Sequence, residues 1–214
     1  SAMDKYTDEQ KAEILKLVRW ITNYGNVYDS ADTYLYNLNG DIVYNFIANF
    51  YLYALYQPTP ELQNRELKAI TRYMGRTVEA APGECGMIKP DGVGYHHKAH
   101  YNQYMYAYKS WIEYAYYLSG TSYKVSNDAY EQMKKAVLTL YMMATNDNND
   151  NHYTANSVGG RNVFGKGGLK TPVTKSDFQK LIEVSKDFYG GTFDHELASA
   201  HNYFNKRAEY VVPD

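Results

Sequence analysis

The chain has 214 residues, with 22 basic and 24 acidic side chains and a formal net charge of −2. It therefore lacks the overall basic field that binds nucleic acid, and we expect no nucleic-acid partner. The length can bury a substantial core in one domain or two small ones. No apolar run approaches the ~18 residues of a membrane span. A single cysteine, Cys85, excludes an intrachain disulfide and any multi-cysteine metal site.

Tyrosine dominates the apolar composition. The chain has 25 tyrosines, which reconcile a hydrophobic share of 44% with a mean hydropathy of −0.60. Because tyrosine buries a large ring and keeps a hydroxyl for hydrogen bonding, most of these residues are expected in the core. The alternative is a sugar-binding cleft lined by exposed rings.

The first third of the chain predicts three helices. Thr7 can cap the first, which would end near Gly25. The second would follow Asn39-Gly40 and stop before Pro58. Thr59-Pro60-Glu61 has the cap, the first-turn proline and the acid of a helix start, and Gly75 fits a C-terminal cap.

The remainder of the chain contains further helices and two irregular segments. The helices are expected from about His100 to Leu118, from Ser126 onward, from the Thr174/Asp177 capping box onward, and over roughly 194–209. Residues 76–97 are irregular, with turns at Pro82-Gly83 and Pro90-Asp91-Gly92. Residues 146–171 form a long loop rich in Asn and Gly, which is typical of a functional loop.

Alternating strand patterns are scarce, so the sequence predicts an all-α fold of about seven helices. Modest connections favour antiparallel helical hairpins, arranged in an incomplete α/α toroid whose long functional loops line a cleft at one end. A plain bundle or a helical repeat is the alternative, although no internal period is evident.

The segment Tyr95-His96-His97-Lys98-Ala99-His100-Tyr101 gathers three histidines and has three interpretations. His97 and His100 could share a helix face and bind a metal, but no His-Glu-x-x-His pattern accompanies them. The histidines could be structural and bond local carbonyls. Alternatively, His97 and Tyr104, seven positions apart, could form an acid–base pair.

A second glycine-rich segment, Gly159–Gly168, contains Arg161 and Asn162. Its glycines let the backbone approach a ligand, and Arg161 offers a planar fork for a carboxylate or sulfate. The spacing matches neither a Walker loop nor a dinucleotide fingerprint. A plain solvent loop is the alternative.

Together these motifs resemble polysaccharide lyase family 8, in particular the chondroitin sulfate ABC lyases. Lys89-Pro90-Asp91-Gly92 followed by an aromatic residue, His97, Tyr101 and Tyr104 is similar to the active-site segment of that family. Gly160-Arg161-x-x-Phe164 is similar to its arginine loop, at a similar distance downstream. The seven-residue gap from histidine to tyrosine favours the ABC type over the hyaluronate and chondroitin AC types.

The resemblance implies β-elimination on uronate-containing glycosaminoglycans such as chondroitin and dermatan sulfate, with no cofactor and no metal. It implies that Tyr104 is the acid and, for glucuronate, also the base. It implies that His97 takes the C5 proton of iduronate and that Arg161 interacts with the tyrosine and the substrate. Substrate-binding residues are expected among Tyr95, His96, His100, Tyr101 and Asn162.

The resemblance also implies a longer protein. Residues 1–3 look like a remnant of cloning, and residues 4–214 are expected to be a single helical catalytic-domain fragment of a secreted or periplasmic lyase. The family has a further catalytic glutamate in a β-rich domain after the helices, so we expect that domain as a missing partner. An isolated fragment would then lack part of the active site.

A function of another class is a non-catalytic module that binds anionic glycans. In that interpretation aromatic residues stack on sugars while basic residues hold the anionic groups. The aromatic residues would be Tyr95, Tyr101 and Trp111, and the basic residues would be Lys89, Lys98, Arg161 and Lys166.

Overall fold

The computed structural model describes residues 2–29, 40–96, 100–102, 105–146, 152–153 and 171–205. Within these ranges the chain forms seven α-helices, and its strands are only two residues long, so the predicted all-α class is confirmed. The helices are α1 (Asp8–Ile21), α3 (Gly40–Leu55), α4 (Pro60–Thr77), α5 (Tyr106–Leu118), α6 (Asn127–Met142), α7 (Lys175–Ser185) and α8 (His195–Phe204). The short elements are the 3-10 helices η1 (Ala2–Lys5) and η2 (Tyr24–Tyr28) and the strands β1 (Tyr95–His96), β2 (His100–Tyr101), β3 (Thr145–Asn146) and β4 (His152–Tyr153).

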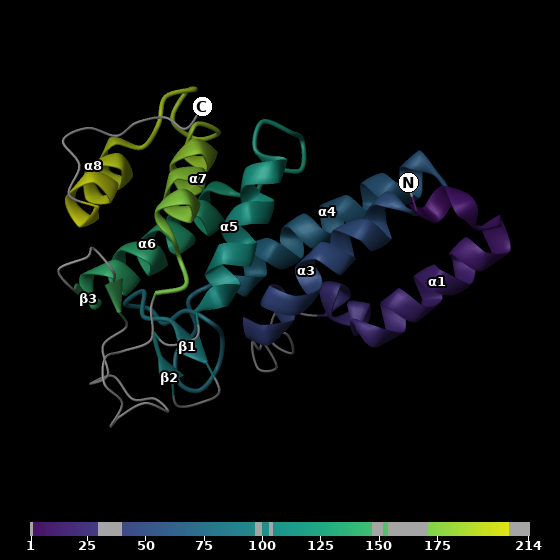
Figure 1. The fold of residues 1–214 in the computed structure, drawn as a ribbon, viewed down its shortest axis with the longest axis horizontal. Helices are drawn as coiled ribbons and strands as arrows, with labels where there is room; N and C mark the ends of the chain where they lie inside the picture. Colours follow the sequence, from purple (N-terminus) through teal and green to yellow (C-terminus); the bar gives the residue numbers. More distant parts are fainter. Residues whose placement is uncertain are drawn as a thin grey trace.

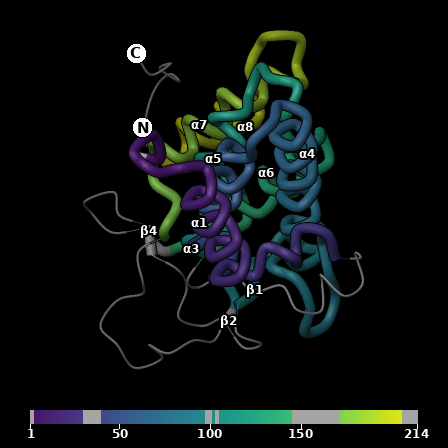
Figure 2. The backbone as a smooth tube through the Cα atoms, turned by 90° about the vertical axis from the view of Figure 1, so that its right-hand side faces the viewer, coloured from purple at the N-terminus to yellow at the C-terminus, as the bar shows by residue number. Residues whose placement is uncertain are grey.

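The helices pack in two rows. In one row α1 contacts α3, α3 contacts α5, α5 contacts α7, and α7 contacts α8. In the other row α4 contacts α6, and α4 also packs on α3, as Figure 2 shows from the side. The hairpin of β1 and β2 lies beside the starts of α3 and α5 (Figure 1). The predicted closure of such rows into a toroid stays a prediction.

Side-chain caps define most helix starts as the sequence predicts. Thr7 and Thr174 form capping boxes with Gln10 and Asp177. Thr59 and Ser126 each accept a backbone hydrogen bond from the first turn of α4 or α6. Each cap stabilises its helix by about 1 kcal/mol.

Tyrosine builds much of the core, as predicted. The rings of Tyr24, Tyr73, Tyr108 and Tyr130 are completely buried. Trp111 is also completely buried, and its indole N–H donates to the carbonyl oxygen of Met74 at 3.0 Å. The alternative interpretation of Trp111 as a sugar-stacking residue is therefore wrong.

Three predicted helix boundaries differ from the structure. The first helix ends at Ile21, and the chain continues into η2. Gly75 lies inside α4, where a side-chain Cβ would be 3.9 Å from the Cβ of Ala129 in α6, an ordinary contact distance. The last helix ends at Phe204 within the described range, and Asp194 is its N-cap.

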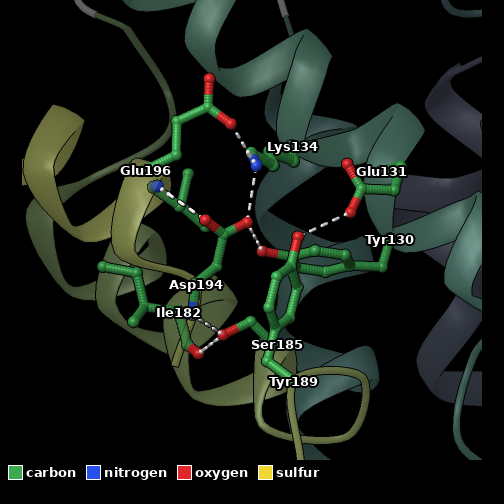
Figure 3. Close-up of polar contacts among 9 residues, drawn as sticks. Tyr130, Glu131, Lys134, Ile182, Ser185, Tyr189, Asp194 and Glu196 are labelled. Atoms are coloured by element: carbon green, nitrogen blue, oxygen red, sulfur yellow. Dashed lines mark hydrogen bonds and ion pairs between the residues drawn. The ribbon is translucent and has the colours of Figure 1, made fainter. Parts of the chain in front are cut away.

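A buried ion pair joins α6 to α8 (Figure 3). The Lys134 ammonium group donates to the carboxylates of Asp194 at 2.6 Å and Glu196 at 2.7 Å. Tyr130 also donates to Asp194, at 2.9 Å. The Asp194 carboxylate accepts the N–H of Leu197 as well, which caps α8. One carboxylate thereby holds the last helix against the rest of the domain.

The buried carboxylate of Asp194 is ionised at lower pH than an ordinary aspartate. Burial alone would raise its pKa, but hydrogen bonds from Lys134, the Leu197 N–H and Tyr130 outweigh burial and hold the pKa below the usual 3.8. The stabilisation is therefore present above that ordinary value and is lost as the pH falls through the lower folded-state pKa.

We predict that Asp194→Ala lowers the free energy of unfolding at pH 7 by about 3–5 kcal/mol, because it leaves a buried ammonium group without its main partner. Glu196→Ala is the matched control. The Glu196 side chain is 75% exposed, so its loss should cost less than about 1 kcal/mol. Urea denaturation of both variants measures this difference. The difference in free energy of unfolding between wild type and Asp194→Ala should become smaller in acid. Equal losses for Asp194→Ala and Glu196→Ala would contradict the assigned role of Asp194.

Candidate active site

The connection between α4 and α5 is organised around the side chain of Lys89, which is 7% exposed. Its ammonium group donates to the carbonyl oxygens of Ala81 at 3.2 Å, Gly83 at 2.7 Å and Cys85, and lies 3.9 Å from the centre of the Tyr95 ring. Burial lowers the pKa of Lys89. The carbonyl oxygens and the ring replace the water that the charge has lost. Lys89 is thus structural, and its interpretation as an anion-binding residue is wrong.

The segment Lys89-Pro90-Asp91-Gly92 forms the turn that its sequence predicts. The N–H of Gly92 donates to the carbonyl oxygen of Lys89 at 2.8 Å, and the Asp91 carboxylate accepts the N–H of Val93 at 3.0 Å. Gly92 has a φ of 88°, in the left-handed region that favours glycine. Lys135 and Thr139 of α6 donate to two carbonyl oxygens of the turn, which fixes the turn against that helix.

A short hairpin follows the turn. Tyr95 lies opposite Tyr101, and His96 lies opposite His100. Asn102 closes the hairpin through Gly94: its N–H donates to the Gly94 carbonyl oxygen at 2.8 Å, and its side-chain oxygen accepts the Gly94 N–H at 2.7 Å. The helix start predicted near His100 is therefore wrong. These residues are in a strand, Asn102 has a φ of 51°, and α5 begins at Tyr106.

Two tyrosines paired across the hairpin differ in exposure. Tyr95 is 5% exposed and Tyr101 is 39% exposed, and their ring centres are 5.2 Å apart. The Tyr95 ring contacts both the Lys89 ammonium group and the Tyr101 ring, so it supports the hairpin. Tyr101 presents its ring to solvent, where a sugar could stack on it.

His96 is a buried contact point between three elements. It is 3% exposed, and its Nε2 atom lies 3.7 Å from the Asp41 carboxylate in the first turn of α3. The hydroxyl of Tyr106, the first residue of α5, donates to the same carboxylate oxygen at 3.0 Å. The His96 and Tyr106 rings meet edge to face, with centres 6.1 Å apart. Asp41 thus joins β1 to the starts of α3 and α5.

A second aromatic contact extends this region onto the surface of α3. The ring of Tyr44 lies 4.6 Å from that of Tyr106 and is 47% exposed. The hydroxyl of Ser110 also donates to the Tyr44 carbonyl oxygen at 3.5 Å. The exposed ring of Tyr44 therefore adjoins the contact of Tyr106 with the Asp41 carboxylate.

The structure brings together three of the predicted substrate-binding residues, Tyr95, His96 and Tyr101. The backbone of His100 pairs with His96, and nothing is described of the His100 side chain. The remaining predicted site residues lie outside the described residues: His97, Tyr104, Arg161 and Asn162.

Sequence reasoning missed Asp41 and Tyr106. Asp41 has the position of an ordinary first-turn acid in a helix, and Tyr106 is one of many tyrosines at helical spacing. They are 65 positions apart, so only the packing of α5 on α3 shows that they meet.

A comparison with family models supplies the identity of the domain. The model described as "Lyase, catalytic" matches residues 6–209, nearly the whole chain. The chain belongs to the catalytic domains of polysaccharide lyase family 8. A search of curated proteins found no match.

A groove of the lyase domain lies elsewhere. It has a volume of about 640 Å³ and runs between η2, α4 and α6. Its lining includes Tyr28, Arg72, Arg76, Lys124 and Gln132, and it contains none of the predicted site residues. The groove is therefore separate from the site around His96.

Two kinds of feature are absent from the described ranges of the lyase domain. There, no three His, Cys, Asp or Glu side chains gather closely enough to hold a metal ion. None of the helices described is both long and apolar enough to cross a membrane.

We predict that Lys89→Met lowers the free energy of unfolding by about 1–3 kcal/mol, because buried carbonyl oxygens lose their donor. Methionine keeps the length of the side chain. The matched control is Lys135→Met, which removes one donor from the exposed side of the turn and should change stability by less than about 0.5 kcal/mol. Thermal and urea unfolding measure both, and a neutral Lys89→Met would contradict the structural role.

Proposed function

We propose that this lyase domain cleaves uronate-containing glycosaminoglycans, chondroitin and dermatan sulfate, by β-elimination. The observation that carries the proposal is the family match over residues 6–209, together with the ordered hairpin and turn of the active-site motif. The match supports a polysaccharide lyase, and the motif around His97 and Tyr104 supports the finer assignment.

The proposed chemistry needs one base and one acid. The base takes the proton from C5 of the uronate, the electron pair of that bond forms the C4–C5 double bond, and the C4–O bond breaks. The leaving oxygen then accepts a proton from the acid. We assign the acid to Tyr104, which also serves as base for glucuronate, and assign the base for iduronate to His97.

Arg161 is assigned to lower the pKa of Tyr104 and to neutralise the uronate carboxylate. A free tyrosine has a pKa of about 10 and is a poor base near neutral pH. A guanidinium group beside Tyr104 would stabilise the phenolate and lower that pKa. Negative charge also grows on the uronate carboxylate as the C5 proton leaves, and a cation there lowers the barrier.

The described residues next to this pair in the chain support the location. His96 directly precedes His97, and its burial against Asp41 gives that segment a fixed support. Tyr101 offers an exposed ring in the strand just before Tyr104. A catalytic group benefits from such a rigid frame, because small errors in position cost large factors in rate.

We further propose that residues 4–214 are part of a longer secreted or periplasmic lyase whose β-rich domain completes the cleft. His100, Tyr101 and Asn162 are proposed to bind the substrate, and the buried residues Tyr95 and His96 are proposed to support them. The alternative, a glycan-binding module without catalysis, has less support because Trp111 and Lys89 are buried and engaged within the protein.

The test is the near-ultraviolet absorbance of unsaturated uronate released from chondroitin and dermatan sulfate. It is run on the 214-residue chain and on a longer polypeptide that carries the proposed β-rich domain. We predict that Tyr104→Phe reduces turnover by about 10²–10⁴-fold on both substrates. His97→Ala should reduce turnover mainly on dermatan sulfate, because that polymer contains iduronate.

Tyr117→Phe is the matched control. Tyr117 is an exposed tyrosine of α5 whose hydroxyl donates to Glu113, and it should leave turnover unchanged. Turnover that survives Tyr104→Phe would overturn the assigned roles. Glycan binding by the longer polypeptide without any absorbance change would favour the non-catalytic module.

A further inference from the structure

We infer that Asp41 is a positioning residue of this site, which holds β1 and the start of α5 in register so that the proposed catalytic pair is correctly placed. The inference rests on the proposed function. It adds to the proposed site a residue that belongs to none of the motifs found in the sequence. Asp41 lies in α3, 65 positions before Tyr106.

The geometry of Asp41 connects the two ends of the catalytic segment. One oxygen of its carboxylate accepts the Tyr106 hydroxyl at 3.0 Å and lies 3.7 Å from Nε2 of His96. In the chain, His96 directly precedes the proposed base His97, and Tyr106 follows the proposed acid Tyr104 by two positions. One carboxylate oxygen thus contacts a residue one position from His97 and a residue two positions from Tyr104 in the chain.

The start of α3 is close enough to the hairpin for this contact to be short. A Cβ at Gly40 would be 3.4 Å from Nδ1 of His96, 3.6 Å from the Cβ of Ala107 and 3.7 Å from the sulfur of Met87. These are ordinary contact distances, so the start of α3 packs on the imidazole of His96, and the carboxylate of Asp41, the next residue, lies 3.7 Å from its Nε2 atom.

The strength of these contacts predicts an effect on rate more than on stability. The Asp41 side chain is 34% exposed, and contacts of partly exposed carboxylates contribute little to the free energy of folding. Displacing a catalytic group by about 1 Å, in contrast, can cost about 10²-fold in rate. Loss of Asp41 should leave the fold intact and slow the reaction.

An ordinary first-turn acid would also interact with the dipole of α3, so one variant is not enough. Asp41→Asn removes the charge but keeps an oxygen that can accept from Tyr106. Tyr106→Phe keeps the charge and removes the donor, and it does not alter the first turn of α3. If Asp41 positions the hairpin and the start of α5, both variants must slow the reaction. If Asp41 interacts only with the helix dipole, Tyr106→Phe must leave the rate unchanged.

The chain offers a matched control pair on α5. The hydroxyl of Tyr117 donates to the Glu113 carboxylate at 2.6 Å, and Glu113 also lies 3.5 Å from the Lys180 ammonium group. The hydrogen bond from Tyr117 to Glu113 reproduces the tyrosine–carboxylate contact of Tyr106 and Asp41 away from the site. Glu113→Gln and Tyr117→Phe therefore measure the cost of breaking such a contact without touching the hairpin.

The experiment combines steady-state kinetics with hydrogen–deuterium exchange of residues 94–102. We expect Asp41→Asn and Tyr106→Phe to lower kcat by about 10- to 100-fold. KM should stay within about twofold, and the melting temperature should shift no more than in the control pair. Exchange in residues 94–102 should become faster in both variants and stay unchanged in both controls. Asp41→Glu, which restores the charge, should recover part of kcat.

Two outcomes would overturn the inference. In the first, Asp41→Asn and Tyr106→Phe have the same kcat as the two control variants. The other is unchanged exchange in residues 94–102 together with a large fall in melting temperature, which would make Asp41 merely structural. If the wild-type protein shows no lyase turnover, the proposed function fails. The exchange measurement still decides whether Asp41 holds the hairpin.

Discussion

The chain between α4 and α5 has little regular structure, and its first part is organised around the buried ammonium group of Lys89. Lys89 donates to the carbonyl oxygens of Ala81, Gly83 and Cys85. Its ammonium group also lies on the ring of Tyr95 in β1. Buried backbone carbonyls must find donors, and here one side chain supplies several. The turn at Pro90-Asp91-Gly92 and the hairpin with His96 follow this loop directly.

The candidate site forms where this loop meets two helix starts. The Asn102–Gly94 hydrogen bonds close the hairpin, and the Asp41 carboxylate joins it to α3 and α5. Helix ends are suitable for such a junction, because their unpaired polar groups and first-turn side chains are free to make contacts outside the helix. A lyase domain whose described residues are mostly helical thereby presents a short loop segment on a frame of helices.

Helices were predictable from the sequence because their signals are local. Thr7, Thr59, Ser126 and Thr174 each cap a helix through a backbone contact three positions away. The hairpin was not predictable, because its strands are two residues long and it is closed by one asparagine at positive φ. The role of Asp41 was not predictable for a similar reason, because it depends on packing between segments 65 positions apart. The motif around His97 did indicate the correct family, since a family motif needs no knowledge of the packing.

We propose that glycosaminoglycan binds where the hairpin meets the starts of α3 and α5. The most direct measurement is hydrogen–deuterium exchange of the protein with and without a chondroitin sulfate oligosaccharide. The account predicts slower exchange in residues 94–102 and in the first turn of α3, and no change along the groove between α4 and α6. Protection confined to that groove, with the hairpin unaffected, would contradict it.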